Sequence, residues 1–253
     1  MNILEQILEV KHKEIERMIP CLSDIDLFEK QSLKDALSVP GISVIAEIKM
    51  KSPSEGEILP NADPVQIAKD YESAGVAAIS VLTDEQFFGG HVDILKAVKK
   101  AVSIPVLRKD FIISNRQIQE AGAIGADAFL LIVEALNIDE LKSLIEFGNE
   151  IGLESLVEFH GEEHAEIVAQ LVPDIVGVNC RDLKTMTTDI SYFEKMISSL
   201  PPTSVKLAES GISTSDDLKY ISELGYDAVL IGTSLMKTGN PGKALERLLG
   251  GLS

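Results

Sequence analysis

Short apolar runs rich in β-branched residues alternate along the chain with segments in which apolar residues recur at helical spacing. The short runs are typical of strands buried on both faces, whereas the longer periodic segments indicate amphipathic helices. Several helical segments end in a glycine, the usual residue just past a helix C-terminus, at Gly75, Gly125, Gly152 and Gly225. The predicted strands are Ser43–Lys49, Ala77–Thr83, Ile104–Phe111, Ala128–Glu134, Glu154–Phe159, Ile175–Arg181, Val205–Ser210 and Ala228–Thr233.

Eight strand–helix units within 253 residues predict an α/β fold of the (β/α)8 TIM barrel type. An open, doubly wound sheet uses the same alternation, but it commonly has fewer strands and a GxGxxG turn after the first one, which this sequence lacks. Two helical segments, Ile3–Met18 and Leu33–Leu37, precede the first strand. We therefore expect residues 1–253 to form a single barrel domain, with residues 1–42 as an N-terminal helical extension that covers part of the barrel.

Polar side chains gather where the predicted strands end, which is the functional face of such a barrel. Most fall two positions after an apolar residue, so they should continue the inward-facing row. A single charged residue at a strand end is usually a solvated rim residue, but a converging set would cost desolvation unless it were paired or used. The polar residues are Glu47, Lys49, Lys51, Lys109, Glu158, Asn179, Arg181, Glu209 and Ser210; the inward apolar residues behind them are Ile45, Leu107, Leu156 and Leu207, and Ile48, Val157, Val178 and Cys180 should face outward.

Two further patterns indicate what this face binds. The last two strands run into ESGIST and IGTSLM, where glycine and hydroxyl residues precede a helix N-terminus, a setting that favours a phosphate. Simple turn and capping chemistry is the competing interpretation. Four apolar residues near strand ends, Phe88, Phe111, Leu130 and Leu183, could wall an apolar pocket. The combination favours acid–base chemistry on a sugar phosphate that carries a flat apolar group.

Composition narrows the choice of partners. A net charge of −17 argues against nucleic acid or an anionic membrane surface. Two distant cysteines and four histidines without an HExxH pair predict neither a disulfide framework nor a metal site. Cys180, His160 and His91 are expected to have structural roles, and Glu134 and Arg108 stay unassigned. No apolar run reaches the roughly 18 residues of a membrane-spanning helix, so we expect a cytoplasmic protein.

The motifs together resemble the indole-3-glycerol phosphate synthase family of tryptophan biosynthesis. The matching stretches occur in order at every predicted strand except the fourth, and the N-terminal helix is similar as well. KSPS, KDF, NxRDL and AESGI are highly specific as a set. The matching stretches are IAEIKMKSPSEG, ISVLTDEQFFGG, PVLRKDFI, LVEFH, VGVNCRDL, LAESGI and LIGTSLM.

The resemblance implies a lyase that closes the indole ring of 1-(2-carboxyphenylamino)-1-deoxyribulose 5-phosphate, with loss of carbon dioxide and water. It implies that Lys109 is the general acid that protonates the ketone oxygen, and that Lys49 holds the substrate carboxylate and assists the dehydration. Glu158 would remove the amine-side proton, and Glu47 would orient the lysines. The resemblance assigns the sugar chain and carboxylate to Asn179, Arg181, Glu209 and Ser210, and the phosphate to Ser210, Gly211, Gly232 and Thr233 with Lys51 or Ser52.

The resemblance also implies no cofactor, and we expect a monomer or weak homodimer. Two departures concern the loop after the first strand: Met50 replaces a common basic residue but should face outward, and Glu55 adds a negative charge that should affect the strength of substrate binding. Ile7 or Leu8 stands where some relatives place an aromatic residue. The alternatives are a phosphoribosylanthranilate isomerase or tryptophan synthase α type of barrel, or a non-catalytic phosphoester-binding barrel. The first two do not need the combination of Glu47, Lys49 and Lys109.

Overall fold

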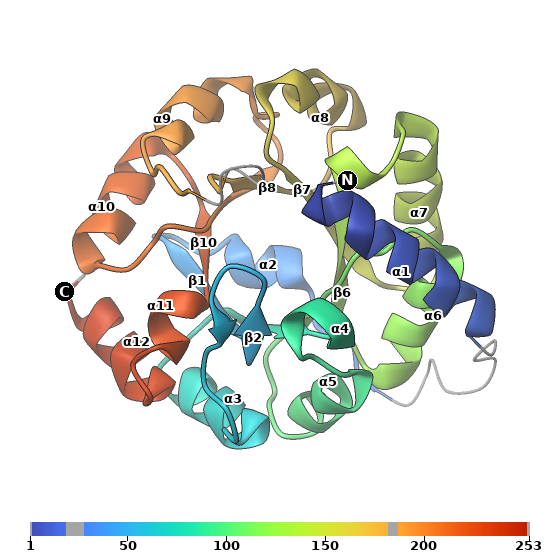
Figure 1. Ribbon diagram of the computed structural model, residues 1–253. Coiled ribbons are helices and arrows are strands. Elements are labelled where there is room, and N and C mark those ends of the chain that lie inside the picture. Colours follow the sequence, from blue (N-terminus) through green and yellow to red (C-terminus); the bar gives the residue numbers. More distant parts are fainter. Residues whose placement is uncertain (1, 19–27, 182–186, 252–253) are drawn as a thin grey trace.

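A closed parallel barrel forms the centre of the molecule (Figure 1). The computed structural model describes residues 2–18, 28–181 and 187–251. In these residues β1 pairs with β10 on one side and with β4 on the other, so the sheet closes and the open-sheet alternative is excluded. The barrel strands are β1 (Ser43–Ile48), β4 (Ala78–Leu82), β5 (Val106–Lys109), β6 (Ala128–Ile132), β7 (Glu154–Phe159), β8 (Ile175–Asn179), β9 (Val205–Glu209) and β10 (Ala228–Ile231).

Helices surround the barrel, and side-chain caps fix where several of them begin. Asp63 accepts from the amides of Val65 and Gln66 at the start of α3, and Gly125, with φ +93°, ends α6 in the left-handed conformation. No helix in the described part of the chain is both long and apolar enough to cross a bilayer. The helices are α1 (Ile3–Arg17), α2 (Leu33–Leu37), α3 (Pro64–Ser73), α4 (Glu85–Phe88), α5 (Val92–Lys99), α6 (Asn115–Ile124), α7 (Ile138–Glu150), α8 (Ala165–Leu171), α9 (Tyr192–Met196), α10 (Ser215–Leu224), α11 (Thr233–Met236) and α12 (Pro241–Gly250).

The alternation of side chains along the strands separates two apolar layers. The four apolar residues that were predicted to face inward belong to the cluster inside the barrel, and the four predicted to face outward pack under the helices. This confirms the prediction of side-chain parity, including the packing role of Cys180, which is 4% exposed. The inner cluster extends to the carboxyl ends of the strands, where it includes Ile132 of β6 and Leu230 of β10, so polar side chains at the ends of the other rows lie on a packed floor.

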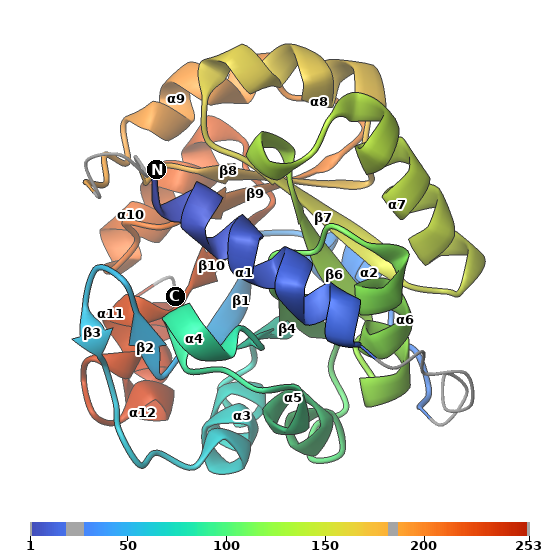
Figure 2. The ribbon, with the colours of Figure 1, turned by 45° about the vertical axis from the view of Figure 1, so that its right-hand side comes forward.

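The two N-terminal helices lie at opposite ends of the barrel. Leu33 and Leu37 of α2 are fully buried in the inner cluster, and Glu154, at the start of β7, accepts hydrogen bonds from Ser32 and from the amide of Lys34. Helix α2 therefore closes the amino-terminal end, whereas α1 crosses the other end near α4 (Figures 1 and 2). The prediction that these helices cover the barrel is confirmed.

The segments just after the strands differ from the predictions. Strand β1 ends at Ile48, and a two-stranded hairpin of β2 (Lys51–Ser52) and β3 (Gly56–Glu57) follows it. Because the chain leaves the barrel before Lys51, that residue does not continue the inward row, and this part of the parity prediction was wrong. Strand β6 likewise stops at Ile132, where a 3₁₀ turn begins.

Candidate active site

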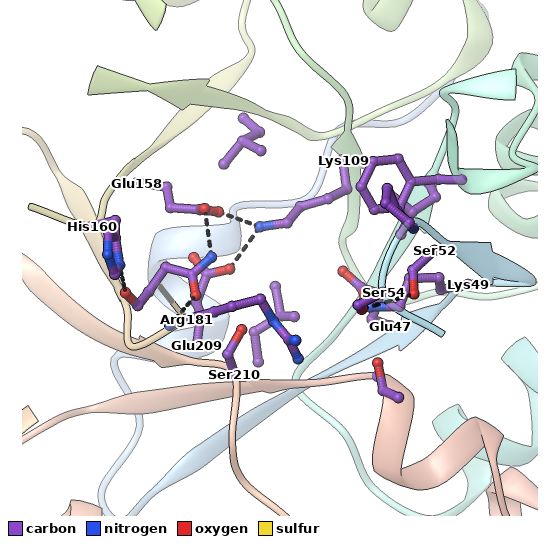
Figure 3. A pocket seen from close by; sticks show the side chains of 18 of the residues that line it. Glu47, Lys49, Ser52, Ser54, Lys109, Glu158, His160, Arg181, Glu209 and Ser210 are labelled. Atoms are coloured by element: carbon purple, nitrogen blue, oxygen red, sulfur yellow. Dashed lines mark hydrogen bonds and ion pairs between the residues drawn. The ribbon is translucent and has the colours of Figure 1, made fainter. Parts of the chain in front are cut away.

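A cavity of about 400 Å³ opens at the carboxyl ends of the barrel strands (Figure 3). Residues from all eight barrel strands or from the loops that follow them contribute to its lining, although they are distant in sequence. Lys51 is not part of the lining; its ammonium donates to the backbone oxygen of Gln86 at 3.2 Å. Leu183 lies outside the described residues. The predicted residues that line the cavity are Glu47, Lys49, Ser52, Phe88, Lys109, Phe111, Leu130, Glu158, Asn179, Arg181, Glu209, Ser210, Gly211, Gly232 and Thr233.

Lys109, the last residue of β5, lies between two carboxyl groups. Its Nζ is 2.5 Å from Oε2 of Glu158 and 2.6 Å from Oε2 of Glu209. Asn179 donates to the other oxygen of Glu158 at 2.9 Å. Figure 3 shows the three charged side chains pointing toward one another from different walls of the cavity. The barrel thus aims one ammonium and two carboxyl groups at a common point.

Burial and mutual charge give these three groups different proton affinities. Burial alone would lower the pKa of Lys109, but the carboxylates of Glu158, Glu209 and Glu47 outweigh it and raise that pKa above its ordinary value. Burial also opposes ionisation of Glu158, yet the Lys109 charge and the Asn179 hydrogen bond lower its pKa. Burial and the charge of Glu158 raise the pKa of Glu209 to about 8, despite Lys109. Glu158 is therefore the ionised member of the pair, and Glu209 holds a proton near neutral pH.

A glycine in the neighbouring strand makes room for Glu209. Gly177 of β8 faces the barrel interior, and a β-carbon at this position would lie 2.4 Å from Oε1 of Glu209. That oxygen is buried and has no hydrogen-bond partner in the described residues. The sequence analysis missed Gly177, although a glycine inside a strand often marks the close approach of another group.

A second ion pair lies at the end of β1. The Nζ of Lys49 is 2.6 Å from Oε1 of Glu47, whose side chain is 5% exposed. Gly232 lies against this glutamate, since a β-carbon there would be 2.5 Å from Oε1. The pair is thus held between the barrel core and the loop that follows β10.

One side of the cavity is apolar. The rings of Phe88 and Phe111 lie with centroids 6.0 Å apart, and Leu130 of β6 lines the same cavity. Helix α1 adds Ile7, with Ile3 and Leu4, whereas Leu8 is not among the lining residues. This wall could hold a flat apolar group above the ammonium of Lys109.

The loops after β9 and β10 form another side. Ser210 and Gly211 have φ +74° and +73°, so the chain turns sharply where β9 ends. The carbonyl oxygen of Ser210 accepts a hydrogen bond from the thiol of Cys180 at 3.3 Å, and burial raises the pKa of that thiol to about 11. Gly232 and Thr233 begin α11. The backbone groups here suit an anion.

The sequence analysis also missed several lining residues. His160, expected to have only a structural role, lines the cavity; its Nδ1 is 2.8 Å from the carbonyl oxygen of Asn179, and its ring stacks on Tyr192. Glu134 accepts from the amides of His160 and Gly161. The other missed residues include Ser54, Ser213, Ser234 and Lys237. They lie in loops or, for Ser234, in the four-residue helix α11, where strand periodicity gives no signal.

Two further predictions concern His91 and metal binding. His91 is the N-cap of α5, where its side chain accepts from the amide of Asp93, so its expected structural role is confirmed. Within residues 2–18, 28–181 and 187–251, no group of three His, Cys, Asp or Glu side chains is arranged to hold a metal ion.

Comparison with known sequences gives a consistent match over nearly the whole chain. A family model described as indole-3-glycerol phosphate synthase matches residues 4–248. The indole-3-glycerol phosphate synthase of Halalkalibacterium halodurans is 47% identical over 252 residues, covering 98% of this chain and 97% of the relative. That of Geobacillus thermodenitrificans is 46% identical with the same coverage of both chains.

Solved structures with low sequence identity share the architecture. A 3-hexulose-6-phosphate synthase from Salmonella typhimurium superposes with a TM-score of 0.67 at 18% identity, covering 83% of this chain and 98% of the other. A chain of the tryptophan synthase complex from Pyrococcus furiosus has a TM-score of 0.62 at 15% identity, covering 82% and 97%. At these identities the likeness shows the TIM-barrel fold alone.

Proposed function

The chain belongs to the indole-3-glycerol phosphate synthase family, and we propose from its cavity how it carries out that family's reaction. Members are carboxy-lyases of tryptophan biosynthesis, and their substrate is 1-(2-carboxyphenylamino)-1-deoxyribulose 5-phosphate. The observation that carries the proposal is the position of Lys109. Its ammonium contacts two carboxyl groups in a cavity with an apolar wall on one side and two backbone-rich loops on another.

In the ring closure, Lys109 protonates the ketone oxygen while the carboxylate-bearing ring carbon attacks the ketone carbon. The carboxylates around Lys109 keep it charged before the reaction, and the negative charge that develops on the ketone oxygen then draws the proton away. The ring nitrogen becomes an iminium and accepts the electrons of the departing carbon dioxide. Because that electron sink is part of the substrate, the step needs positioning and a proton and no separate electron acceptor.

The dehydration needs a second acid and a base. Lys49 delivers a proton to the departing hydroxyl group, and Glu47, 2.6 Å from it, orients this lysine. Glu158 takes the proton from the carbon beside the ring nitrogen, which suits its ionised state. Asn179 fixes the orientation of Glu158 through its hydrogen bond.

The remaining lining residues hold the two ends of the substrate. Phe88, Phe111 and Leu130 contact the anthranilate ring, and Leu183, outside the described residues, is proposed to join them. Asn179, Arg181, Glu209 and Ser210 hold the sugar hydroxyls and the substrate carboxylate. Ser52 and the backbone of Ser210, Gly211, Gly232 and Thr233 bind the phosphate. Lys51 keeps only a long-range electrostatic role in this scheme, since it does not line the cavity.

We further propose a cytoplasmic monomer or weak homodimer that acts without a cofactor and folds as one domain over residues 1–253. The cytoplasmic location rests on the sequence alone and stays a prediction. The absence of a cofactor follows from the electron sink within the substrate.

The test is to mix the purified protein with the carboxyphenylamino substrate and to follow indole fluorescence without added cofactor. Wild-type protein should form product, and Lys109→Ala should lower kcat by roughly 100- to 10,000-fold, the usual contribution of a general acid. Lys100→Ala, an exposed lysine at the end of α5, is the matched control and should behave as wild type. Normal turnover by Lys109→Ala would refute the assignment.

A further inference from the structure

Helix α1 carries a lysine where its apolar stripe should continue. Ile3, Ile7 and Lys11 follow one another at intervals of four residues, so their side chains lie on one face of the helix. Ile3 and Ile7 line the cavity, and Lys11 is only 2% exposed. A buried ammonium is costly unless anions compensate it, so its surroundings indicate what it holds together.

Three carboxylates surround this ammonium. The Nζ of Lys11 lies 2.8 Å from Oδ2 of Asp84, 2.9 Å from Oδ1 of Asp110 and 2.9 Å from Oε2 of Glu14. Burial would lower the pKa of Lys11, but the charges of Asp110 and Asp84 outweigh it and raise the pKa above its ordinary value. Lys11 is therefore a fixed positive charge between α1 and the barrel mouth.

The two aspartates belong to parts of the cavity wall. Asp110 follows Lys109 at the end of β5, and Asp84 is the N-cap of α4, where its other oxygen accepts from the amides of Phe87 and Phe88. One ammonium thus connects the helix that carries Ile3 and Ile7 to the short helix that carries Phe88. All three apolar residues line the same cavity.

The two aspartates depend on Lys11 to different degrees. Asp110 also accepts from Thr83 at 2.5 Å and from Arg108 at 3.3 Å, so it keeps partners when Lys11 is removed. Asp84 is fully buried and keeps the two amide donors on its Oδ1, but in the described residues Lys11 is its only ion-pair partner and the group that faces its Oδ2. Loss of Lys11 would leave the charge of Asp84 buried until α1 or α4 moved to admit water.

From this geometry we propose that Lys11 is a positioning residue, which holds α1 and α4 together so that their apolar side chains close the ring-binding end of the cavity. The inference rests on the proposed function, because it assigns that end to the anthranilate ring. The inference treats this wall separately from the loops after β9 and β10, because no ion pair among the described residues connects those loops to Lys11 or to its three carboxylates. Removing Lys11 should therefore weaken ring binding and leave phosphate binding intact.

The experiment compares Lys11→Met with Lys13→Met, an exposed lysine of the same helix. We expect Lys11→Met to raise KM about tenfold with kcat within about threefold of wild type, since a buried charge loses its partner. The inhibition constant of inorganic phosphate should not change. Adding Asp84→Asn to Lys11→Met should lower KM part of the way back to the wild-type value, because asparagine still caps α4 but carries no charge.

Amide hydrogen exchange gives a readout that needs no substrate. Exchange in residues 3–17 should be faster in Lys11→Met than in Lys13→Met, so the docking of α1 is tested even if the protein forms no indole product. Failure of wild type to turn over would refute only the proposed function. Equal KM values for the two lysine variants, or a phosphate inhibition constant that weakens in parallel with KM, would overturn the inference. If Lys11→Met does not fold, the double variant carries the test, and a wild-type KM in it would overturn the inference.

Discussion

Glu158 and Glu209 contact the same ammonium, yet their surroundings give them different protonation states. Glu158 has both Lys109 and Asn179 as donors, whereas one oxygen of Glu209 is buried against Gly177 and has no hydrogen-bond partner among the described residues. The ionised form is stabilised where donors are available and penalised where they are not. Two glutamates beside one ammonium can therefore have different roles, Glu158 as a base and Glu209 as a protonated group.

The raised pKa of Glu209 predicts a pH dependence of folding. This pKa is about 8 in the folded state against an ordinary value of 4.5. Between these values the folded chain holds a proton that the unfolded chain releases, so the free energy of unfolding should fall as pH rises, by at most about 1.4 kcal/mol per pH unit. Above about pH 8 this contribution is constant. The lowered pKa of Glu158 acts below its ordinary value, outside this window.

Urea denaturation at several pH values between about 5 and 8 measures this dependence. Glu209→Gln keeps the size of the side chain and removes its titration, so the free energy of unfolding of this variant should vary less with pH in the same range. Identical pH profiles for wild type and Glu209→Gln would contradict the protonated state assigned to Glu209.

Gly177→Ala should disturb catalysis without touching the substrate. The added β-carbon would lie 2.4 Å from Oε1 of Glu209 and 3.3 Å from Leu156, so the carboxyl group that contacts Lys109 must shift. We expect a loss of about 1–3 kcal/mol in stability from overpacking and a fall in kcat of up to roughly 100-fold from the misplaced groups. Gly250→Ala, where the added methyl group meets open space, is the control for both measurements. A stable protein with unchanged kcat would show that the position of Glu209 does not matter.

At the residue scale, the sequence predicted side chains that lie on strands better than those on loops and helices. The two-residue period placed Glu47, Lys109 and Glu158 correctly above the inner core. It could not place Lys11, because a lysine on an amphipathic helix normally faces water and its carboxylate partners Asp84 and Asp110 are distant in the sequence.

At the scale of elements, the order and type of the strands and main helices were predictable, and the elements after the strands were not. Strand β7 and helix α2 have the predicted bounds, whereas α4, α11 and the β2–β3 hairpin were not expected. These pieces are two to four residues long, too short for a period to be detected. They nevertheless carry part of the cavity wall, since Ser52, Phe88 and Thr233 belong to them.

An ion pair connects the hairpin to the neighbouring loop after β10, and only the unusual charge of Glu55 was noted from the sequence. Glu55 lies 2.6 Å from Lys237, which follows α11 and lines the cavity. Glu55→Gln should release this ammonium toward an anionic substrate and remove a negative charge beside it. Because the pair is partly exposed, we expect KM to fall by only about two- to fivefold.

Salt dependence tests this explanation. The difference in KM between wild type and Glu55→Gln should be present at about 0.02 M salt and largely lost at about 0.5 M, because salt screens exposed charges. Glu57→Gln, on the exposed strand β3 of the same hairpin, is the control. A higher KM in Glu55→Gln would mean that the pair acts mainly by holding the hairpin over the cavity.

At the scale of the whole molecule, closure of the barrel couples ligand binding at one part of the cavity to the stability of the whole barrel. Strand β10 pairs with both β9 and β1, so the loops proposed to bind phosphate follow strands at the point where the last barrel strand closes against the first. A ligand that binds only the folded state stabilises the whole cooperative unit. Eight strands in one closed sheet are expected to unfold together rather than to lose β9 and β10 alone.

Inorganic phosphate should therefore raise the melting temperature of the entire protein. At a concentration of about 100 times its dissociation constant it should add about 2.7 kcal/mol, or roughly 5–10 °C for a chain of this size. Sodium chloride at equal ionic strength should not produce this shift. Gly232→Ala should reduce it, since the added β-carbon would meet Glu47 at 2.5 Å and displace the loop, whereas Gly250→Ala should keep the full shift relative to its own melting temperature. An undiminished shift in Gly232→Ala would place the anion elsewhere on the molecule, and the phosphate end of the substrate would have to be reassigned with it.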